Sequence, residues 1–405
     1  MENVSSRCGK SDNAPRLRFP EFSGEWVEKK LREIIIEVKR KAEENSKAPV
    51  MMISATEGFI NQSERYSSNN AGKSLKKYTL LKKGELAYNH GYSKTRNFGS
   101  CFTLEIEQAR IPFVYHSFSL KGENDSVFWG KYLNSGLFDG KLRRLVASTA
   151  RMDGLLNISF ENYSSMPVNI PSLPEQKKIA AFFTLLDRRI QKQRQFVERL
   201  KTYKRGVSEA IFERKFGFPN KTNWKKIKIE NLFSERCERA IGNEELLAVT
   251  INGGIQKRNE IQLKDNSSED KSNYKRVHIG DIAYNTMRMW QGASGVSCYA
   301  GIVSPAYTVI VLKDKENQCI DFWGHYFKHT NLIRTFQKFS QGLTSDTWNL
   351  KYAQLSQINL YVPEYKEQCA IANFLHKFDS KISIEEKKLS QLSMLKNELL
   401  HRMFI

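Results

Sequence analysis

A partial phosphate-binding motif is the first feature of the sequence that could do chemistry. Gly72-Lys73-Ser74 matches the end of the Gly-x-x-x-x-Gly-Lys-Ser/Thr loop, but Ser67 stands where the first glycine belongs. His325 and His329 have a spacing that on a helix can hold a metal, yet no acidic residue lies between them. The sequence also has no Asn-Pro-Pro-aromatic or Asp-Pro-Pro-Tyr segment of an amino-methyltransferase. We therefore expect no catalytic residue, metal site or cofactor in this chain.

Two loops, residues 88–97 and 284–292, combine side chains that read base edges in DNA. Arginine can pair with guanine, and asparagine or glutamine with adenine. Tyr88-Asn89 returns as Tyr284-Asn285, so a structural role for these four residues is equally open. The residues beyond them differ between the loops, as two readers of different sequences would. The candidate base contacts are Asn89, His90, Tyr92, Lys94, Arg96, Asn97, Asn285, Arg288, Trp290 and Gln291.

The charge balance favours a polyanionic partner. Lysine and arginine outnumber aspartate and glutamate by 64 to 44, which gives a formal net charge of +20. Such an excess is self-repulsive, and DNA is the first candidate partner. Two further loops, 148–152 and 341–345, offer Arg151, Thr344 and Ser345. The candidate phosphate contacts, for each of which ordinary solvated charge is the alternative, are Lys73, Lys76, Arg143, Arg144, Lys257, Arg258, Lys275 and Arg276.

The elements that would position these residues occur twice. Phe128-Trp129-Gly130-Lys131-Tyr132 returns as Phe322-Trp323-Gly324-His325-Tyr326, 194 positions later. Trp26 similarly matches Trp224, 198 positions later. A period of about half the chain is too long for a solenoid repeat, so it predicts two similar domains in tandem. Short mixed segments and many glycines indicate an α+β fold for each domain.

Each domain is followed by a long amphipathic pattern that begins at a proline. Apolar residues alternate at spacings of four and three over five heptads, which predicts a coiled-coil helix. Polar interruptions fall at Gln193 and Lys204 in the first pattern and at Glu385 and Lys396 in the second. The first seam is Ile179, Phe183, Leu186, Ile190, Val197, Leu200, Val207 and Ile211. The second, 192 positions later, is Ile371, Leu375, Phe378, Ile382, Leu389, Leu392, Leu399 and Met403.

This equivalence predicts that the two helices pack against each other. The alternative is that each helix packs only on its own domain. The predicted pair runs antiparallel, and about 39 residues at 1.5 Å each give a rod of roughly 58 Å. A crossing near residue 198 would place Lys204 level with Glu385 and Gln193 level with Lys396. Such polar layers would fix the register of the pair.

The remaining composition excludes a secreted or membrane-spanning protein. The six cysteines include no Cys-x-x-Cys pair, which is typical of reduced thiols in a cytosolic protein. Residues 1–20 lack the apolar core of a signal peptide, and no apolar run reaches about 18–20 residues. We expect a cytoplasmic protein with no membrane partner.

The residues around the helix starts resemble the specificity (S) subunit of type I restriction–modification systems. The resemblance rests on Arg18-Phe19-Pro20-Glu21-Phe22 with Trp26 and Leu31. It also rests on the repeated opening of the long helices, a proline followed by Glu-Gln and Ile-Ala. The matching segments are Ile170-Pro171-Ser172-Leu173-Pro174-Glu175-Gln176 with Ile179-Ala180, and Val362-Pro363 with Glu367-Gln368 and Ile371-Ala372.

The resemblance implies two tandem pseudo-repeat target-recognition domains separated by two long antiparallel coiled-coil helices. Each domain would read half of a bipartite double-stranded DNA target, and the helices would set the spacing and dock two methyltransferase (M) subunits. Restriction (R) subunits would join through them. S-adenosylmethionine, ATP and Mg²⁺ belong to the partners. The domains would be a tail at 1–15, recognition domains at 16–170 and 217–362, and spacer helices at 171–216 and 363–405.

Two other functions stay open from the residues alone. One is a stand-alone coiled-coil DNA-binding scaffold or regulator, which would not co-purify with a methyltransferase. The other is a self-contained nucleic-acid enzyme, which the absence of phosphate-loop and methyltransferase motifs disfavours. A purified chain that cut or modified DNA alone would support the enzyme.

Overall fold

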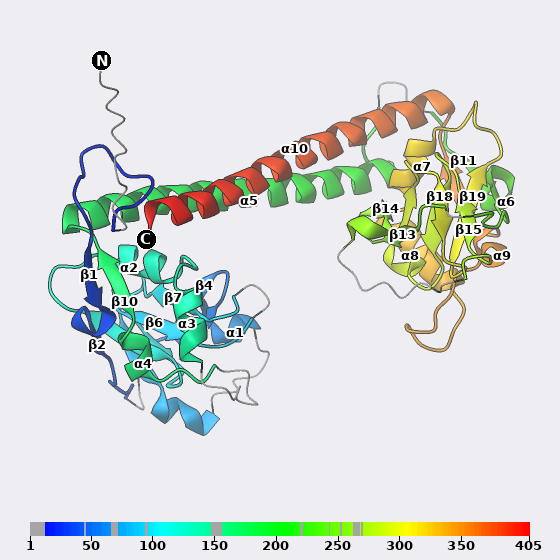
Figure 1. The fold of residues 1–405 in the computed structure, drawn as a ribbon. Helices are drawn as coiled ribbons and strands as arrows, with labels where there is room; N and C mark the ends of the chain where they lie inside the picture. The colour runs from blue at the N-terminus through cyan, green and yellow to red at the C-terminus, as the bar shows by residue number, and fades with distance from the viewer. Residues whose placement is uncertain are drawn as a thin grey trace, which may run out of the picture. The chain divides into compact units, whose positions relative to one another are not determined.

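The computed structural model describes residues 13–43, 46–65, 72–93, 96–146, 156–218, 222–242, 244–251, 253–261, 268 and 270–405. The chain divides into two compact units. Unit 1 contains residues 1–193 and 388–405, and unit 2 contains residues 194–387. Each unit therefore includes one half of each long helix (Figure 1).

Both units are α+β, as the sequence predicts. The strands of unit 1 are β1 (Val27–Lys30), β2 (Ile35–Glu37), β3 (Met51–Ser54), β4 (Gly58–Asn61), β5 (Thr79–Lys82), β6 (Leu86–Asn89), β7 (Ser100–Thr103), β8 (Gln108–Ile111), β9 (His116–Leu120) and β10 (Pro167–Ile170). The strands of unit 2 are β11 (Lys225–Lys228), β12 (Phe233–Glu235), β13 (Leu247–Thr250), β14 (Gly254–Lys257), β15 (Lys275–Val277), β16 (Ile282–Asn285), β17 (Ser294–Val296), β18 (Gly301–Val303), β19 (Tyr307–Leu312) and β20 (Asn359–Val362).

Short helices connect the strands of both units, and three of them lie between the last two strands of each unit. Those of unit 1 are η1 (Leu31–Glu33), α1 (Gln62–Arg65), η2 (Gly72–Lys77), α2 (Ser126–Leu133), α3 (Asp139–Leu145) and α4 (Phe160–Ser164). Those of unit 2 are α6 (Ile229–Leu232), η3 (Arg258–Glu260), η4 (Met289–Gln291), α7 (Ile320–Tyr326), α8 (Thr330–Phe339) and α9 (Tyr352–Leu355). The long helices are α5 (Leu173–Phe212) and α10 (Tyr365–Met403).

The strand pairing of unit 1 is repeated strand for strand in unit 2. A four-stranded antiparallel sheet has the order β2-β9-β6-β7 in unit 1 and β12-β19-β16-β17 in unit 2. Three two-stranded pairs accompany each sheet: β1-β10, β3-β4 and β5-β8 correspond to β11-β20, β13-β14 and β15-β18. The sequence repeat therefore encodes one architecture twice. Among the described residues, no helix carries an apolar run of membrane-spanning length.

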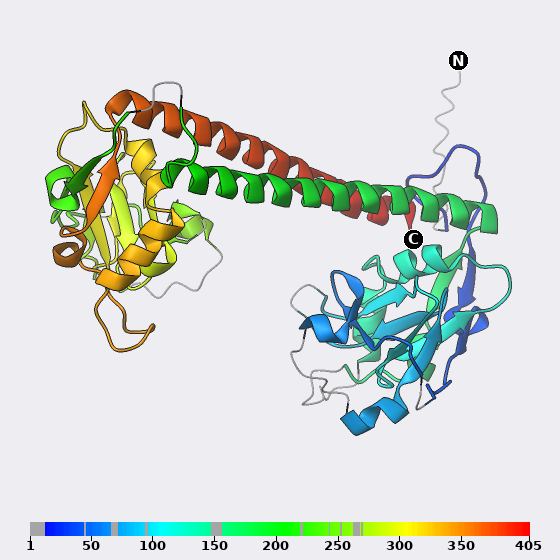
Figure 2. The same ribbon diagram turned by 180° about the vertical axis from the view of Figure 1, so that it is seen from behind.

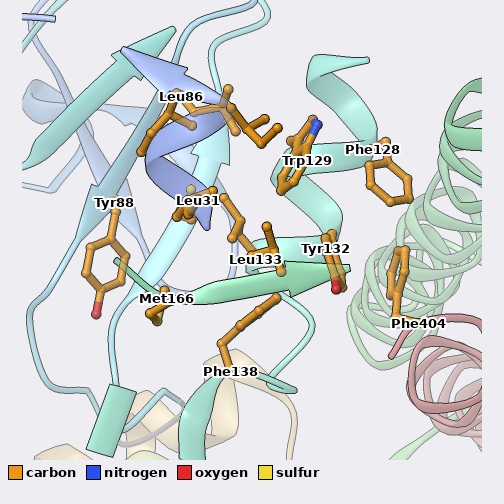
Figure 3. Packing of buried hydrophobic residues seen from close by; sticks show 14 of the residues in the cluster. Leu31, Leu86, Tyr88, Phe128, Trp129, Tyr132, Leu133, Phe138, Met166 and Phe404 are labelled. Carbon is orange, nitrogen blue, oxygen red and sulfur yellow. The ribbon is translucent and has the colours of Figure 1, made fainter. Parts of the chain in front are cut away.

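The core of unit 1 joins the repeated aromatic helix α2 to both long helices. Phe128, Trp129 and Tyr132 are buried on α2, and Phe404 from the end of α10 packs on them (Figure 3). The Phe404 ring centroid lies 5.6 Å from that of Phe128 and 5.1 Å from that of Tyr132. Phe183 of α5 stacks on the other side of Phe404 at 5.6 Å. The helix ends are thus part of the core of the unit.

Unit 2 has the same core, in which Phe212 takes the place of Phe404. The two residues are equivalent in the repeat, 192 positions apart. The ring of Phe212 stacks on Tyr326 at 4.8 Å and meets Phe322 at 5.8 Å. The chain leaves α5 at Arg214, whose φ of 61° is left-handed. The backbone N–H of Lys215 then bonds to the carbonyl of Ala210 and closes the helix end. The helix thus ends at Phe212, before Gly217.

The Glu-Gln pair at the start of each long helix anchors that helix to its unit. The buried carboxylate of Glu175 accepts bonds from Arg18 at 2.7 Å and from the indole N–H of Trp26 at 3.4 Å. The amide of Gln176 accepts the backbone N–H of Asp125 at 3.0 Å, just before α2, and donates to the carbonyl of Pro171 at 3.1 Å. The motif therefore fixes α5 to β1 and α2.

Unit 2 repeats this anchor with different donors. Glu367 accepts the indole N–H of Trp224 at 3.3 Å and the backbone N–H of Thr222 at 2.7 Å. Gln368 accepts the N–H of Cys319 at 3.0 Å and donates to the carbonyl of Pro363 at 3.0 Å. Neutral donors thus take the place that Arg18 has in unit 1.

In each unit the two long-helix segments run antiparallel, and the predicted seam side chains are all buried or half-buried. The expected polar register is wrong. Lys204 donates to Asp379 at 2.5 Å, six positions before Glu385, and Lys396 donates to Asp187 at 2.6 Å, six positions before Gln193. These two pairs are equivalent in the repeat. In each pair a lysine of the seam meets an aspartate outside the seam, and the seam pattern alone gave no information on residues outside it.

Replacing Asp187 by asparagine is expected to lower the unfolding temperature at pH 7 more than at pH 3.5. Burial raises the pKa of Asp187, but the cations of Lys131 and Lys396 outweigh burial and lower it overall. Because the pKa of Asp187 is lower in the folded than in the unfolded chain, its carboxylate stabilises the fold at pH values above the unfolded-state pKa near 3.8. This stabilisation is lost as the pH falls through the folded-state pKa. Thermal unfolding of both proteins at each pH measures the difference. Exposed Asp346→Asn is the control, and a pH-independent effect would contradict this role.

Candidate nucleic-acid interface

The loop after β16 in unit 2 is a rigid platform for an exposed arginine. The side-chain oxygen of Asn285 accepts the N–H of Met287 at 3.0 Å, and Met289 is buried beneath the loop. Arg288 is exposed and donates to the side-chain oxygen of Gln291 at 3.3 Å. The indole N–H of Trp290 donates a hydrogen bond to the carbonyl of Met287 at 3.0 Å. Asn285 thus shapes the turn, which favours the structural role for the repeated Tyr-Asn pair.

A second loop, residues 341–349, lies beside this platform. Its ends pair through two backbone bonds between Gln341 and Asn349, of 2.9 and 2.8 Å. The ring of Trp348 meets Trp290 at 5.1 Å, nearly perpendicular to it. The N–H of Leu350 bonds to the carbonyl of Thr286 at 2.9 Å. The structure therefore brings the candidates Arg288, Trp290 and Gln291 next to the loop that carries the exposed residues Thr344 and Ser345.

Lys328 ties the platform to the turn between β13 and β14. Its ammonium group donates to the carbonyl of Gly292 at 2.5 Å and to that of Ile251 at 2.9 Å. Burial, together with the nearby charge of Lys204, lowers the pKa of Lys328 to about 8. The half-buried ammonium group holds two surface turns together, since its backbone partners come from both.

The exposed face of α8 carries cations that sequence reasoning missed. Arg334 and Lys338 are one turn apart and exposed, while Leu332 and Phe336 of the same helix are buried. Arg288 on the platform and Lys351 after the second loop are also exposed. Within the described residues, no carboxylate forms an ion pair with these four side chains. The amphipathic pattern of residues 330–339 was the signal that could have found this face.

The predicted phosphate contacts Lys257, Lys275 and Arg276, unlike the α8 cations, form ion pairs within the protein. Carboxylates hold all three: Glu245 lies 3.6 Å from Lys257, Glu235 lies 3.3 Å from Lys275, and Glu244 lies 2.7 Å from Arg276. Arg258 is half-buried in η3. A phosphate would have to displace a carboxylate at each paired cation, so these residues are weaker candidates than the α8 cations.

His325 and His329 contact different carboxylates and do not face a common site. His325 on α7 lies 3.8 Å from Asp379, and burial together with the charge of Lys204 lowers its pKa to about 4. His329 lies with Glu209 of α5 and with Glu213, just past the end of α5, and one ring nitrogen and two carboxylate oxygens of this group lie within 4.8 Å of one another. Glu209 accepts the first N–H of α8, from Thr330, at 3.1 Å, and lies 2.9 Å from the His329 ring nitrogen. These contacts secure α8 against α5.

The corresponding loop of unit 1 places its candidates differently. His90 is buried, and its ring nitrogens contact the carbonyls of Leu156 at 2.7 Å and Val114 at 2.8 Å. Its side chain is therefore occupied, and we remove it from the candidate base contacts. The side-chain oxygen of Asn89 accepts the N–H of Gly91 at 3.0 Å, as Asn285 does for its own turn.

Other candidates in unit 1 remain at the surface. Tyr92 is 63% exposed, and Asn97 is exposed. Arg96 is half-buried, and its charge acts on Asp139 at the start of α3: burial raises the pKa of Asp139, and Arg96 opposes that rise.

Helix α3 corresponds to α8, and its last turn holds Arg143 and Arg144, both exposed. Lys76 is exposed in η2. Lys94, Arg151 and the side chain of Lys73 lie outside the described residues.

Comparison with known proteins identifies a protein family that this chain resembles. Residues 221–394 match the family model of the type I restriction modification DNA specificity domain. No curated protein sequence gives a significant match. Among the described residues, cysteines 101, 237, 298, 319 and 369 form no disulfide bond.

Two solved structures have the same fold over nearly the whole chain. One is described as the S subunit of a type I restriction–modification system from M. genitalium, with 14% identity, a TM-score of 0.56, and coverage of 97% of this chain and 99% of that one. The other comes from a study of complex assembly and conformational transition in a type I R-M system, with 12% identity, a TM-score of 0.55, and coverage of 94% and 97%.

These findings define a protein with the fold of DNA-specificity subunits. The resemblance seen in the sequence is confirmed: residues 221–394 match the family model of the specificity domain, and the chain shares its fold with an S subunit of a type I restriction–modification system.

Proposed function

We propose that this chain is the specificity subunit that reads a bipartite DNA target for a type I restriction–modification complex. One observation carries the proposal: both units have the same strand order, while their exposed loops differ in sequence. Equal scaffolds with unequal loops suit two recognition domains, residues 16–170 and 217–362, that read two different half-sites. Helices at 171–216 and 363–405 would act as the spacer.

Docking of two M subunits, with R subunits joining through them, rests on the outward faces of the long helices. In unit 1, Leu185 is 64% and Met394 is 69% exposed. In unit 2, Tyr203 is 62% and Ile384 is 52% exposed. Contiguous exposed apolar patches mark interaction surfaces, and these side chains are the candidates for such patches on the long helices. The methyl-transfer and ATP-dependent reactions, with S-adenosylmethionine, ATP and Mg²⁺, would belong to those cytoplasmic partners, and this chain would contribute no catalytic residue.

Reconstitution with the methyltransferase encoded beside this gene tests the proposal. We expect the two proteins to co-purify, and methyl groups from S-adenosylmethionine to enter DNA only when both are present. The methyltransferase alone and this chain alone are the controls. A chain that binds DNA but never captures the methyltransferase would point to the stand-alone regulator instead, and a chain that cuts or modifies DNA alone would point to the enzyme.

Replacing Arg334 and Lys338 together by alanine is expected to flatten the salt dependence of DNA binding. Each neutralised phosphate contributes about −0.9 to the slope of log K against log salt, so the slope should become shallower by about 1.8. Fluorescence anisotropy between about 50 and 200 mM salt measures this. Lys275→Ala is the matched control, because Glu235 already pairs with that cation. An unchanged slope in the double variant would place the phosphates elsewhere.

A further inference from the structure

Leu343 is the most exposed large apolar side chain of the described residues. It is 100% exposed, at the tip of the loop 341–349. This orange loop protrudes from the body of unit 2 in both views (Figures 1 and 2). Burying such a side chain against a partner lowers the free energy, and the free protein lacks this stabilisation while Leu343 is fully exposed. The position therefore suggests a contact made only in a complex.

The loop holds Leu343 on a braced backbone. The N–H groups of Thr347 and Trp348 both bond to the carbonyl of Thr344, at 2.9 and 3.1 Å. The hydroxyl of Thr347 accepts the N–H of Thr344 at 3.1 Å. With the Trp348–Trp290 contact, these bonds fix the tip relative to Arg288. A preorganised tip loses little conformational freedom on binding, which favours recognition.

The surroundings of Leu343 indicate which partner buries it. Polar residues flank the leucine on both sides, and exposed, unpaired cations lie on the adjoining elements at Arg288, Arg334, Lys338 and Lys351. Asp346 is the one acidic residue in the segment 330–351. An apolar protein partner would have to desolvate these cations, whereas a DNA duplex would pair with them. DNA presents an apolar group to side chains in its major groove, the C5 methyl of thymine.

We propose that Leu343 is a specificity-determining residue that contacts the methyl group of a thymine in the half-site read by unit 2. The inference rests on the proposed function and deepens it. Arg288 and the polar residues of the loop hydrogen-bond base edges, and Leu343 adds the contact that no hydrogen-bonding group can make. Thymine differs from uracil only by this methyl group, so the contact predicts discrimination between the two bases.

The test uses the assembled complex of this chain with its methyltransferase and duplexes of its own target sequence. Each thymine of the second half-site is replaced singly by deoxyuridine, and affinities are measured by competition. At one position, uracil is expected to weaken binding roughly fourfold, the factor that burial of one methyl group gives. The Leu343→Ala complex should bind the thymine and uracil duplexes equally. Ile279→Ala, another exposed apolar residue of unit 2, should keep the wild-type discrimination.

Three outcomes would overturn the inference. They are an equal uracil penalty in the wild-type and Leu343→Ala complexes, no uracil penalty at any position, and a second half-site without thymine. Because Leu343 is fully exposed, the variant is expected to fold, and the uracil series in the wild-type complex needs no variant. A wild-type complex that fails to prefer any sequence would sink the proposed function itself, whereas a selective complex that ignores Leu343 would sink only this inference.

Discussion

Replacing Arg288 by alanine is expected to cost the assembled complex about 1–3 kcal/mol of affinity for its target and to relax the sequence requirement at one position. Arg288 is the exposed cation of the rigid platform, and Gln291 orients its guanidinium group at 3.3 Å. A bidentate contact with guanine would use that planar group directly. Competition binding against duplexes altered one base pair at a time in the second half-site would measure the change.

The matched control for Arg288 is Arg334→Ala on α8. Arg334 is an exposed cation that we assign to a phosphate, so its removal should weaken binding to all duplexes by a similar factor. Equal weakening of every duplex by Arg288→Ala would show that Arg288 is also a phosphate contact. Altered preference in the first half-site would contradict the assignment of Arg288 to the second.

Replacing Glu175 by alanine is expected to destabilise the folded chain by about 3–5 kcal/mol, the usual cost of breaking a buried ion pair. The carboxylate is 1% exposed and holds the guanidinium of Arg18 and the indole of Trp26. Its loss removes the acceptor of the Trp26 indole and leaves the guanidinium of Arg18 without its buried counter-charge at the junction of α5 and β1. Urea unfolding followed by tryptophan fluorescence would measure the loss.

Glu367→Ala in unit 2 gives the informative comparison. The donors to Glu367 are neutral, so the expected cost is only about 1–3 kcal/mol. Glu364→Ala, at an exposed position near the start of α10, should have almost no effect. A loss for Glu175→Ala no larger than that for Glu364→Ala would mean that the repeated Glu-Gln motif is not the anchor described here.

The parts of the fold that follow from regular patterns could be predicted from the sequence. The repeat predicts two equivalent α+β units, because identical aromatic residues at equal spacing make identical cores. The seven-residue period predicts the long helices, and the equivalence of the two copies predicts that they run antiparallel. The register could not be predicted, since Asp379 and Asp187, the partners of the seam lysines Lys204 and Lys396, lie outside the seam.

Candidate contacts with DNA were harder to predict, because residue type does not reveal exposure or pairing. His90 has the chemistry of a base contact but is buried between two carbonyls. Lys275 and Arg276 have the charge for a phosphate but lie beside carboxylates brought close by folding. Arg334 and Lys338, by contrast, are freed from such partners by the amphipathic packing of α8. Burial and ion pairing are properties of the folded chain, which a single sequence does not display.

Modified-base sequencing of the source genome, with and without this gene, tests the central claim most directly. We predict that a bipartite motif, two short sequences separated by unread base pairs, is methylated when the gene is present and unmethylated when it is deleted. Restoring the gene should restore the same motif. A methylated bipartite motif that persists after deletion, in cells whose adjacent methyltransferase is expressed, would contradict the claim that this chain selects the DNA sequence.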